Sequence, residues 1–153
     1  MTSVFRVSVE LKERIKAKQF LEAVREIEER FPYYKVKLKA GFFWYYLEPH
    51  ELPINVIPDQ ETPCRSFDKD ELMFRVLAKN STISVEFSHI LTDGTGALEF
   101  LKTLLMVYFE KCSLQMPSNL QFMRPDQNPE KEEFEDAYKR YFRKINSRPV
   151  KIP

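Results

Sequence analysis

The residues of this sequence that are best suited to chemistry lie together at positions 89–94, directly after a strand-like segment. His89 is one of two histidines, and a neutral imidazole can accept a proton near pH 7. Asp93 stands where a helix should begin, and free backbone N–H groups stabilise a carboxylate there. Gly94 and Gly96 allow a tight turn and close packing. We therefore predict a candidate site in this loop, with His89 at the end of a strand and Asp93 and Gly94 at the turn into the following helix.

Each of these residues also has an ordinary structural interpretation. A single buried histidine is more often a core residue than a catalyst, and Asp-Gly commonly begins a helix. The two glycines are not a dinucleotide-binding fingerprint, because the third glycine would fall at Glu99. A hydrolase is disfavoured as well. Alternation points Ser88 away from the histidine, and Cys64 and Cys112 lie in no nucleophile motif.

The elements that must position this loop can be predicted from the hydrophobic periods of the chain. Ile83, Val85 and Phe87 alternate with polar residues, which predicts a strand whose buried face continues to His89. Trp44 falls in the aromatic strand of a hairpin and is expected in the sheet core rather than against a substrate. In chain order we expect a strand at 4–11, a helix at 15–31, a hairpin at 33–48, a short strand at 54–57, strands at 72–78 and 82–88, and helices at 97–111 and 130–144.

The composition excludes several classes of protein. The 24 basic and 23 acidic residues leave a formal charge of +1, which disfavours a nucleic-acid binder. Two cysteines without a CxxC motif and two histidines make a structural zinc site implausible. The polar N-terminus does not resemble a signal peptide, and apolar runs such as 104–109 are far shorter than a membrane span of about 20 residues. We expect a cytoplasmic protein without a membrane span.

Residues 89–94 match the HxxxDG motif, and the chain resembles the chloramphenicol acetyltransferase-like superfamily, which includes peptide-synthetase condensation domains and alcohol acetyltransferases. Residues 30–38, 43–48 and 63–65 are similar to the bacterial alcohol acetyltransferase branch. The resemblance runs from about residue 4 to 144 and covers the N-terminal half of such enzymes. It implies an α+β two-layer sandwich, with a mostly antiparallel sheet and helices packed on one face. Residues 1–112 would form this lobe, followed by a linker at 113–129, the helix at 130–144 and a tail at 145–153.

The resemblance also implies a mechanism. His89 would be the general base that activates an alcohol or amine acceptor for attack on an acyl thioester, with acetyl-CoA or another acyl-CoA as co-substrate and no metal. Asp93 would be structural and paired with a basic residue, for which Lys35, Arg65 and Arg75 are candidates. Gly94 would let the loop close under the histidine. Nothing like the DFGWG motif of the second lobe is present, and the residues that bind the acyl donor are not identified.

Two functions remain open at this point. The chain is expected to be one lobe of an acyl-CoA-dependent acyltransferase, completed by a second lobe in cis or by self-association. The alternative is a non-catalytic binding or scaffolding module on the same fold, in which His89 is retained as a structural residue.

Overall fold

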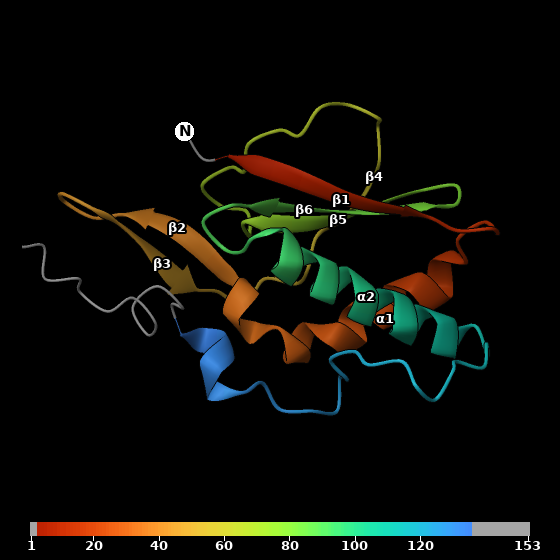
Figure 1. The fold of residues 1–153 in the computed structure, drawn as a ribbon. Coiled ribbons are helices and arrows are strands. Elements are labelled where there is room, and N and C mark those ends of the chain that lie inside the picture. The colour runs from red at the N-terminus through yellow and green to blue at the C-terminus, as the bar shows by residue number, and fades with distance from the viewer. Residues whose placement is uncertain (1–2, 136–153) are drawn as a thin grey trace, which may run out of the picture.

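The computed structural model describes residues 3–135, in which two helices cover one face of a four-stranded sheet and a hairpin projects beside it (Figure 1). This is the expected mixed α+β architecture, with a mostly antiparallel sheet. The elements are β1 (Val4–Glu10), α1 (Ala17–Ile27), η1 (Glu28–Arg30), η2 (Pro32–Tyr34), β2 (Val36–Ala40), β3 (Tyr45–Pro49), β4 (Val56–Pro58), β5 (Phe74–Lys79), β6 (Thr82–Ser88), α2 (Gly94–Lys111) and η3 (Lys131–Phe134).

The main sheet has the strand order β1-β6-β5-β4. β5 and β6 form an antiparallel hairpin, β1 pairs antiparallel with β6, and β4 pairs parallel with β5. Ile83, Val85 and Phe87 of β6 are fully buried in the core against the helices, which confirms the face predicted from their alternation. The two helices contribute the other side of this core through residues that include Phe20, Val24, Ile27, Phe100, Leu104 and Val107.

The helices begin and end where local chemistry dictates. α2 starts at Gly94, three residues before the predicted start, because the Asp93 side chain accepts the Gly96 N–H and caps the helix. α1 ends at Ile27, and the 3-10 turn η1 takes the place of its predicted last turn. Pro32 disfavours helical geometry in the residue before it, and Phe31 accordingly has φ −120° and ψ 53°.

The face of the sheet away from the helices is polar and is nevertheless buried. Glu86 accepts hydrogen bonds from Arg6 Nε at 2.9 Å and from Arg75 Nε at 2.7 Å. The segment 59–70 passes over these side chains. Arg6 donates to the Thr62 carbonyl, and the Arg75 guanidinium lies 4.3 Å from the centre of the Phe67 ring. β6 is therefore covered on both faces, and charged residues hold the cover in place.

The hairpin of β2 and β3 forms a separate two-stranded sheet. Its position confirms the predicted hairpin, but the expectation for Trp44 is wrong. This side chain is 63% exposed, because the hairpin extends past the end of the main sheet and no other element among residues 3–135 packs on its tip (Figure 1). On the neighbouring strand β2, the Lys37 side chain is buried, and its ammonium lies 3.8 Å from the Asp70 carboxylate.

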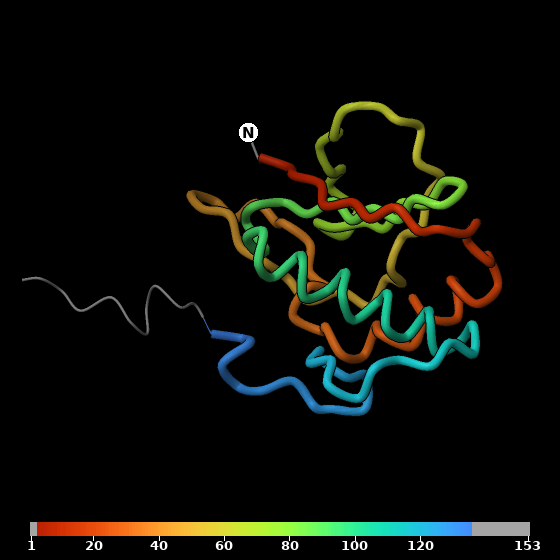
Figure 2. The backbone as a smooth tube through the Cα atoms, turned by 45° about the vertical axis from the view of Figure 1, so that its right-hand side comes forward, coloured from red at the N-terminus to blue at the C-terminus, as the bar shows by residue number. Residues whose placement is uncertain are grey.

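The segment after α2 returns along the helices without forming a helix or strand until η3 (Figure 2). Within the described part of the predicted helix at 130–144 there is only this four-residue 3-10 turn, and Glu135 is extended. Residues 136–144 and the tail at 145–153 lie outside the described residues. Between residues 3 and 135, no helix is long and apolar enough to cross a membrane.

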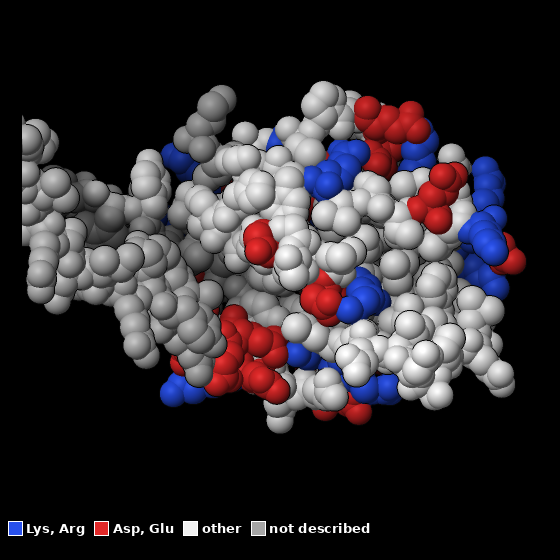
Figure 3. Space-filling view, in the orientation of Figure 1, with Lys and Arg blue, Asp and Glu red and all other residues white. Residues whose placement is uncertain are grey.

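A partly buried ion pair attaches η3 to the two 3-10 turns that follow α1. Arg30 donates to both oxygens of Glu133, at 2.7 and 2.8 Å, and the Tyr33 hydroxyl donates to the same carboxylate at 2.6 Å. Burial alone would raise the pKa of Glu133, but the hydrogen bonds from Arg30 and Tyr33 hold it at about 2. Acidic side chains cluster around this attachment, at the lower left of Figure 3.

The attachment predicts a pH-dependent stability. Because the pKa of Glu133 is about 2 in the folded chain and near 4.5 when unperturbed, its contribution is complete above pH 4.5 and is lost as the pH falls toward 2. We expect Glu133→Gln to lower the free energy of unfolding by roughly 1–3 kcal/mol at pH 7. Urea unfolding at pH 7 and at pH 2.5 measures this. If the wild type and Glu133→Gln differ in free energy of unfolding by the same amount at both pH values, the pKa assigned to Glu133 is contradicted.

Candidate functional site

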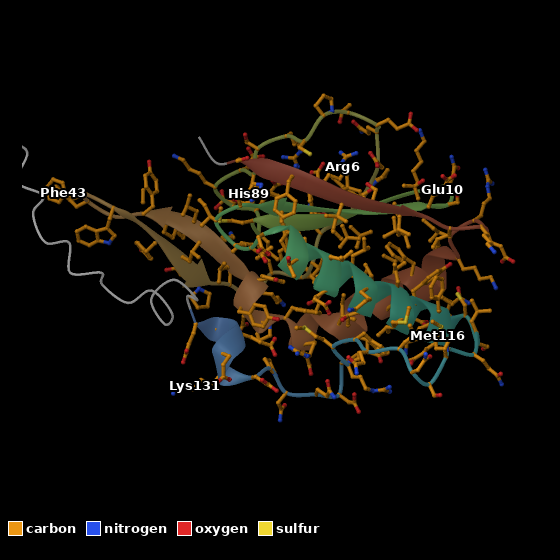
Figure 4. The ribbon with its side chains drawn as sticks, viewed as in Figure 1. Arg6, Glu10, Phe43, His89, Met116 and Lys131 are labelled. Atoms are coloured by element: carbon orange, nitrogen blue, oxygen red, sulfur yellow. The ribbon has the colours of Figure 1, made fainter. Side chains whose placement is uncertain are left out.

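His89 lies at the end of the sheet where β1 begins and β6 ends (Figure 4). Its backbone N–H donates to the Ser3 carbonyl at 2.9 Å, which extends the β1–β6 pairing by one residue. Its ring lies on the same face as Phe87, as predicted, with its centre 4.3 Å from that of the Phe5 ring. The prediction that this side chain is buried is wrong, because the covered face ends at Phe87 and His89 is exposed.

The turn after β6 fixes the direction of the backbone at His89. The Leu91 N–H donates to the Ser88 carbonyl at 2.9 Å, and the Ile90 N–H donates to the Ser88 hydroxyl at 3.3 Å. The Ser88 side chain is fully buried and is used in this turn. It therefore does not pair with His89 as a nucleophile, in agreement with the expected opposite orientation of the two side chains.

Asp93 acts through the helix that it caps. Its carboxylate accepts the Gly96 N–H at 3.0 Å, and its carbonyl accepts the Ala97 N–H at 3.1 Å. The predicted ion pair with a basic residue is not formed by any of the three candidates. They pair elsewhere: Lys35 with Glu28 at 3.0 Å, Arg65 with Glu71 at 2.7 Å, and Arg75 with Glu86 at 2.7 Å. Arg75 extends from the other face of the sheet, beneath the segment 59–70, and so points away from Asp93.

The two glycines of the loop have different roles. A Cβ on Gly94 would meet no atom within 4 Å, and the residue does not have a positive φ. A Cβ on Gly96 would lie 1.9 Å from Thr92 Oγ1 and 2.8 Å from the Tyr34 hydroxyl. The close packing expected of the glycines is therefore confirmed at Gly96, whereas no tight turn requires a glycine at position 94.

Tyr34 is the supporting residue that the motif itself did not point to. Its hydroxyl donates to Thr92 Oγ1 at 3.2 Å, and its ring is stacked on Phe31 and packed edge-on against Phe87. It joins the aromatic core to the loop that carries His89. The available signal was its place at residues 30–38, one of the stretches on which the expected resemblance was based.

Alanine substitutions at the two glycines should separate these roles. Gly96→Ala should lower the free energy of unfolding by about 1–3 kcal/mol, since the new methyl group would displace Thr92 and break its bond with Tyr34. Gly94→Ala should be neutral or stabilising by up to about 1 kcal/mol, because it adds a better helix former in open space. Thermal and urea unfolding of both variants test this. Equal effects at the two positions would contradict it.

Other reactive groups give the site no additional chemistry. Both cysteines are free thiols, and Cys64 lies at the surface. Partial burial and the Glu86 carboxylate raise the pKa of the Cys64 thiol, which disfavours the nucleophilic thiolate. Between residues 3 and 135, no three His, Cys, Asp or Glu side chains are grouped so that they could hold a metal ion.

The arrangement can therefore perform one chemical task, the transfer of a proton. The imidazole of His89 is open to solvent on a rigid sheet end, and within the described part of the chain no hydrogen bond occupies its ring nitrogens. A base of this kind contributes to a rate when an acceptor is positioned against it.

No family model and no curated protein matches the sequence. Solved structures match its fold. The X-domain from teicoplanin biosynthesis matches at 18% identity and a TM-score of 0.57, over 77% of this chain and 31% of that one, and it has also been solved in a complex with OxyB. The starter condensation domain of rhizomide synthetase RzmA matches at 12% identity and a TM-score of 0.59, over 78% of this chain and 35% of that one. SgcC5 from Streptomyces globisporus matches at 12% identity and a TM-score of 0.59, over 76% and 32%.

These matches cover about a third of the length of each solved chain. The chain described here therefore has the mixed α+β fold found in part of the X-domain and of the rhizomide starter condensation domain.

Proposed function

We propose that this chain is a lobe of an acyltransferase in which His89 activates an alcohol or amine acceptor for attack on an acyl thioester. The observation that supports the proposal is the exposed imidazole at the end of β6, directly before a helix capped by Asp93, in a fold found in condensation domains. Acyl-CoA is the donor we propose, and a second lobe would supply most of its channel.

The reaction needs one group that accepts a proton. As the acceptor oxygen or nitrogen attacks the thioester carbonyl carbon, His89 takes its proton and the carbonyl electron pair moves to the oxygen. Collapse of this tetrahedral intermediate breaks the C–S bond, and the imidazolium returns the proton to the departing thiolate. The products are an ester or amide and a free thiol, with His89 neutral again.

Thiol release from acetyl-CoA in the presence of primary alcohols and amines tests this proposal directly. The 153-residue chain should release thiol above the buffer rate, and His89→Ala should remove that excess. A parallel reaction with the acetyl thioester of N-acetylcysteamine tests how much of the donor site this lobe supplies, because equal rates with the two thioesters would assign recognition of CoA to the second lobe. Release equal to buffer from both proteins would contradict catalysis by this lobe.

A binding module is the second candidate, and one observation favours it. Within the described residues nothing orients the imidazole by a hydrogen bond, whereas a general base is usually held in place by a partner on its other nitrogen. The X-domain, which matches this fold, has been solved in a complex with another protein, OxyB. If the chain is such a module, thiol release will be unaffected by His89→Ala.

A further inference from the structure

The tip of the β2–β3 hairpin carries six consecutive apolar residues, all of them exposed. Phe43 marks this tip at the far left of Figure 4, well beyond the sheet end where His89 lies. Phe42 is 92% exposed, Phe43 87% and Tyr45 73%. Successive residues of a strand point to opposite faces, so both faces of the hairpin tip are apolar. Trp44, Tyr46 and Leu47 complete the patch, which we call the aromatic tip.

The aromatic tip is held in a defined conformation. The Gly41 N–H donates to the Trp44 carbonyl at 2.6 Å and closes the loop between the strands. A Cβ on Gly41 would lie 3.3 Å from the Trp44 indole nitrogen, which shows how closely that ring folds back over the backbone. Phe42 and Phe43 pack edge to face, with ring centres 5.3 Å apart. A preorganised apolar surface loses little conformational entropy when it is covered.

The exposed surface approaches what a contact between two copies needs. An aromatic side chain buries about 150–250 Å² when it is fully covered, so the exposed fractions of the five aromatic residues correspond to roughly 700 Å², divided between the two faces of the hairpin. Each partner of a standard protein interface contributes about 800 Å², so a contact through one face would lie at the small end of the range. Apolar patches on monomers are rarely this large, and an isolated two-stranded hairpin is only marginally stable without further strands or packing.

The charges near the aromatic tip indicate which partner would cover it. Lys39 on β2 pairs with Glu48 on β3 at 3.7 Å, and both side chains remain partly exposed. The hairpin therefore presents a positive and a negative charge side by side. An anionic membrane or a nucleic acid would require an excess of positive charge. A second copy of the hairpin, related by a two-fold axis, offers the same apolar surface and an opposite charge for both Lys39 and Glu48. The net charge of +1 adds little repulsion between copies.

We propose that two copies of this chain associate through their aromatic tips, aromatic face against aromatic face, in a closed two-fold dimer. This goes beyond the acyl-transfer proposal and does not depend on His89.

The test is the molar mass in solution. Size-exclusion chromatography with light scattering, over a concentration series, should show a species of about twice 18.3 kDa. The triple variant Phe42→Ser, Phe43→Ser, Tyr45→Ser should raise the dimer dissociation constant at least about tenfold, because the lost contacts are the largest in the patch. The three positions are exposed, so their replacement should leave the far-UV circular dichroism unchanged. The matched control carries Leu98→Ser, Leu114→Ser and Leu120→Ser, three exposed apolar residues elsewhere, and should dimerise like the wild type.

Three outcomes of the light-scattering experiment would overturn the proposal. These are a monomer at every concentration, a hairpin variant that dimerises as well as the control, or open-ended oligomers in place of a closed dimer. Binding of the wild-type chain to phosphatidylcholine–phosphatidylserine vesicles, without a dimer in solution, would assign the aromatic tip to a membrane and would also overturn it. His89→Ala should dimerise like the wild type, so a failure of the acyl-transfer proposal leaves this measurement unaffected.

Discussion

Replacing Glu86 with alanine should lower the free energy of unfolding by about 3–5 kcal/mol, the largest effect on stability that we expect of a single substitution in this chain. Glu86 and Arg75 are almost completely buried, and the carboxylate also accepts hydrogen bonds from Arg6. Removing it leaves a buried guanidinium without its closest anion. A domain of this size has roughly 5–15 kcal/mol of stability, so the variant should be only marginally folded at 25 °C.

The contributions of charge and of volume can be separated with a second variant. Breaking a buried ion pair costs more than replacing both partners by apolar residues of similar size. The double variant Arg75→Met, Glu86→Leu should therefore be more stable than Glu86→Ala, even though it changes more atoms. Arg6 should keep its ion pair with Asp59, at 3.2 Å, in both variants, so it should contribute equally to the two stabilities.

Urea unfolding measures both values, and Glu10→Ala is the matched control. Glu10 is a carboxylate on the neighbouring strand, but it is exposed at the end of β1, and its loss should change the stability by no more than about 0.5 kcal/mol. A cost below about 1 kcal/mol for Glu86→Ala would show that water reaches the charged cluster and that the segment 59–70 does not seal it.

Replacing His89 with alanine should lower the rate of thiol release by about 10²–10⁴-fold, the range typical of a lost general base. The side chain is exposed and its ring contact is with Phe5, so the fold should tolerate the change. The loss should appear in kcat more than in KM, because the base acts on the transition state and not on the bound ground state.

His50 offers a matched control for this experiment. It is the other histidine of the chain, and its Nδ1 accepts the Leu52 N–H at 3.2 Å, so it has a local structural role. His50→Ala should retain the thiol-release rate of the wild type within a small factor. Equal losses for the two variants would mean that the rate follows stability, and His89 would not be the base.

The sequence by itself determined the strands of the main sheet, most of the two helices and the inward face of β6. Alternation at residues 82–88 identified β6 with its core side, and the strand, turn and helix around His89 followed from the same periods and from Asp93 as a helix cap. These features depend on contacts between residues close in the chain, or on a hydrophobic period that reports directly which side is buried.

Only the tertiary structure decided the burial of the polar face and the partners of the charged residues. Arg75 and Asp93 were candidates for one pair, yet the structure places Arg75 against Glu86 on the covered face, while Asp93 caps α2. The path of irregular loops such as 59–70 across the sheet decides which basic residue reaches a given carboxylate. Such loops have no hydrophobic period from which this path could be predicted.

The same division applies to exposure. The sequence predicts that Trp44 and His89 are both buried. Alternation indicates the face of the sheet on which a side chain lies, but not how far the covering elements extend along that face. The hairpin continues past the main sheet, and His89 lies one residue beyond β6, where its covered face has ended, so both side chains are exposed. Burial depends on what lies opposite, and only the assembled fold brings that surface into place.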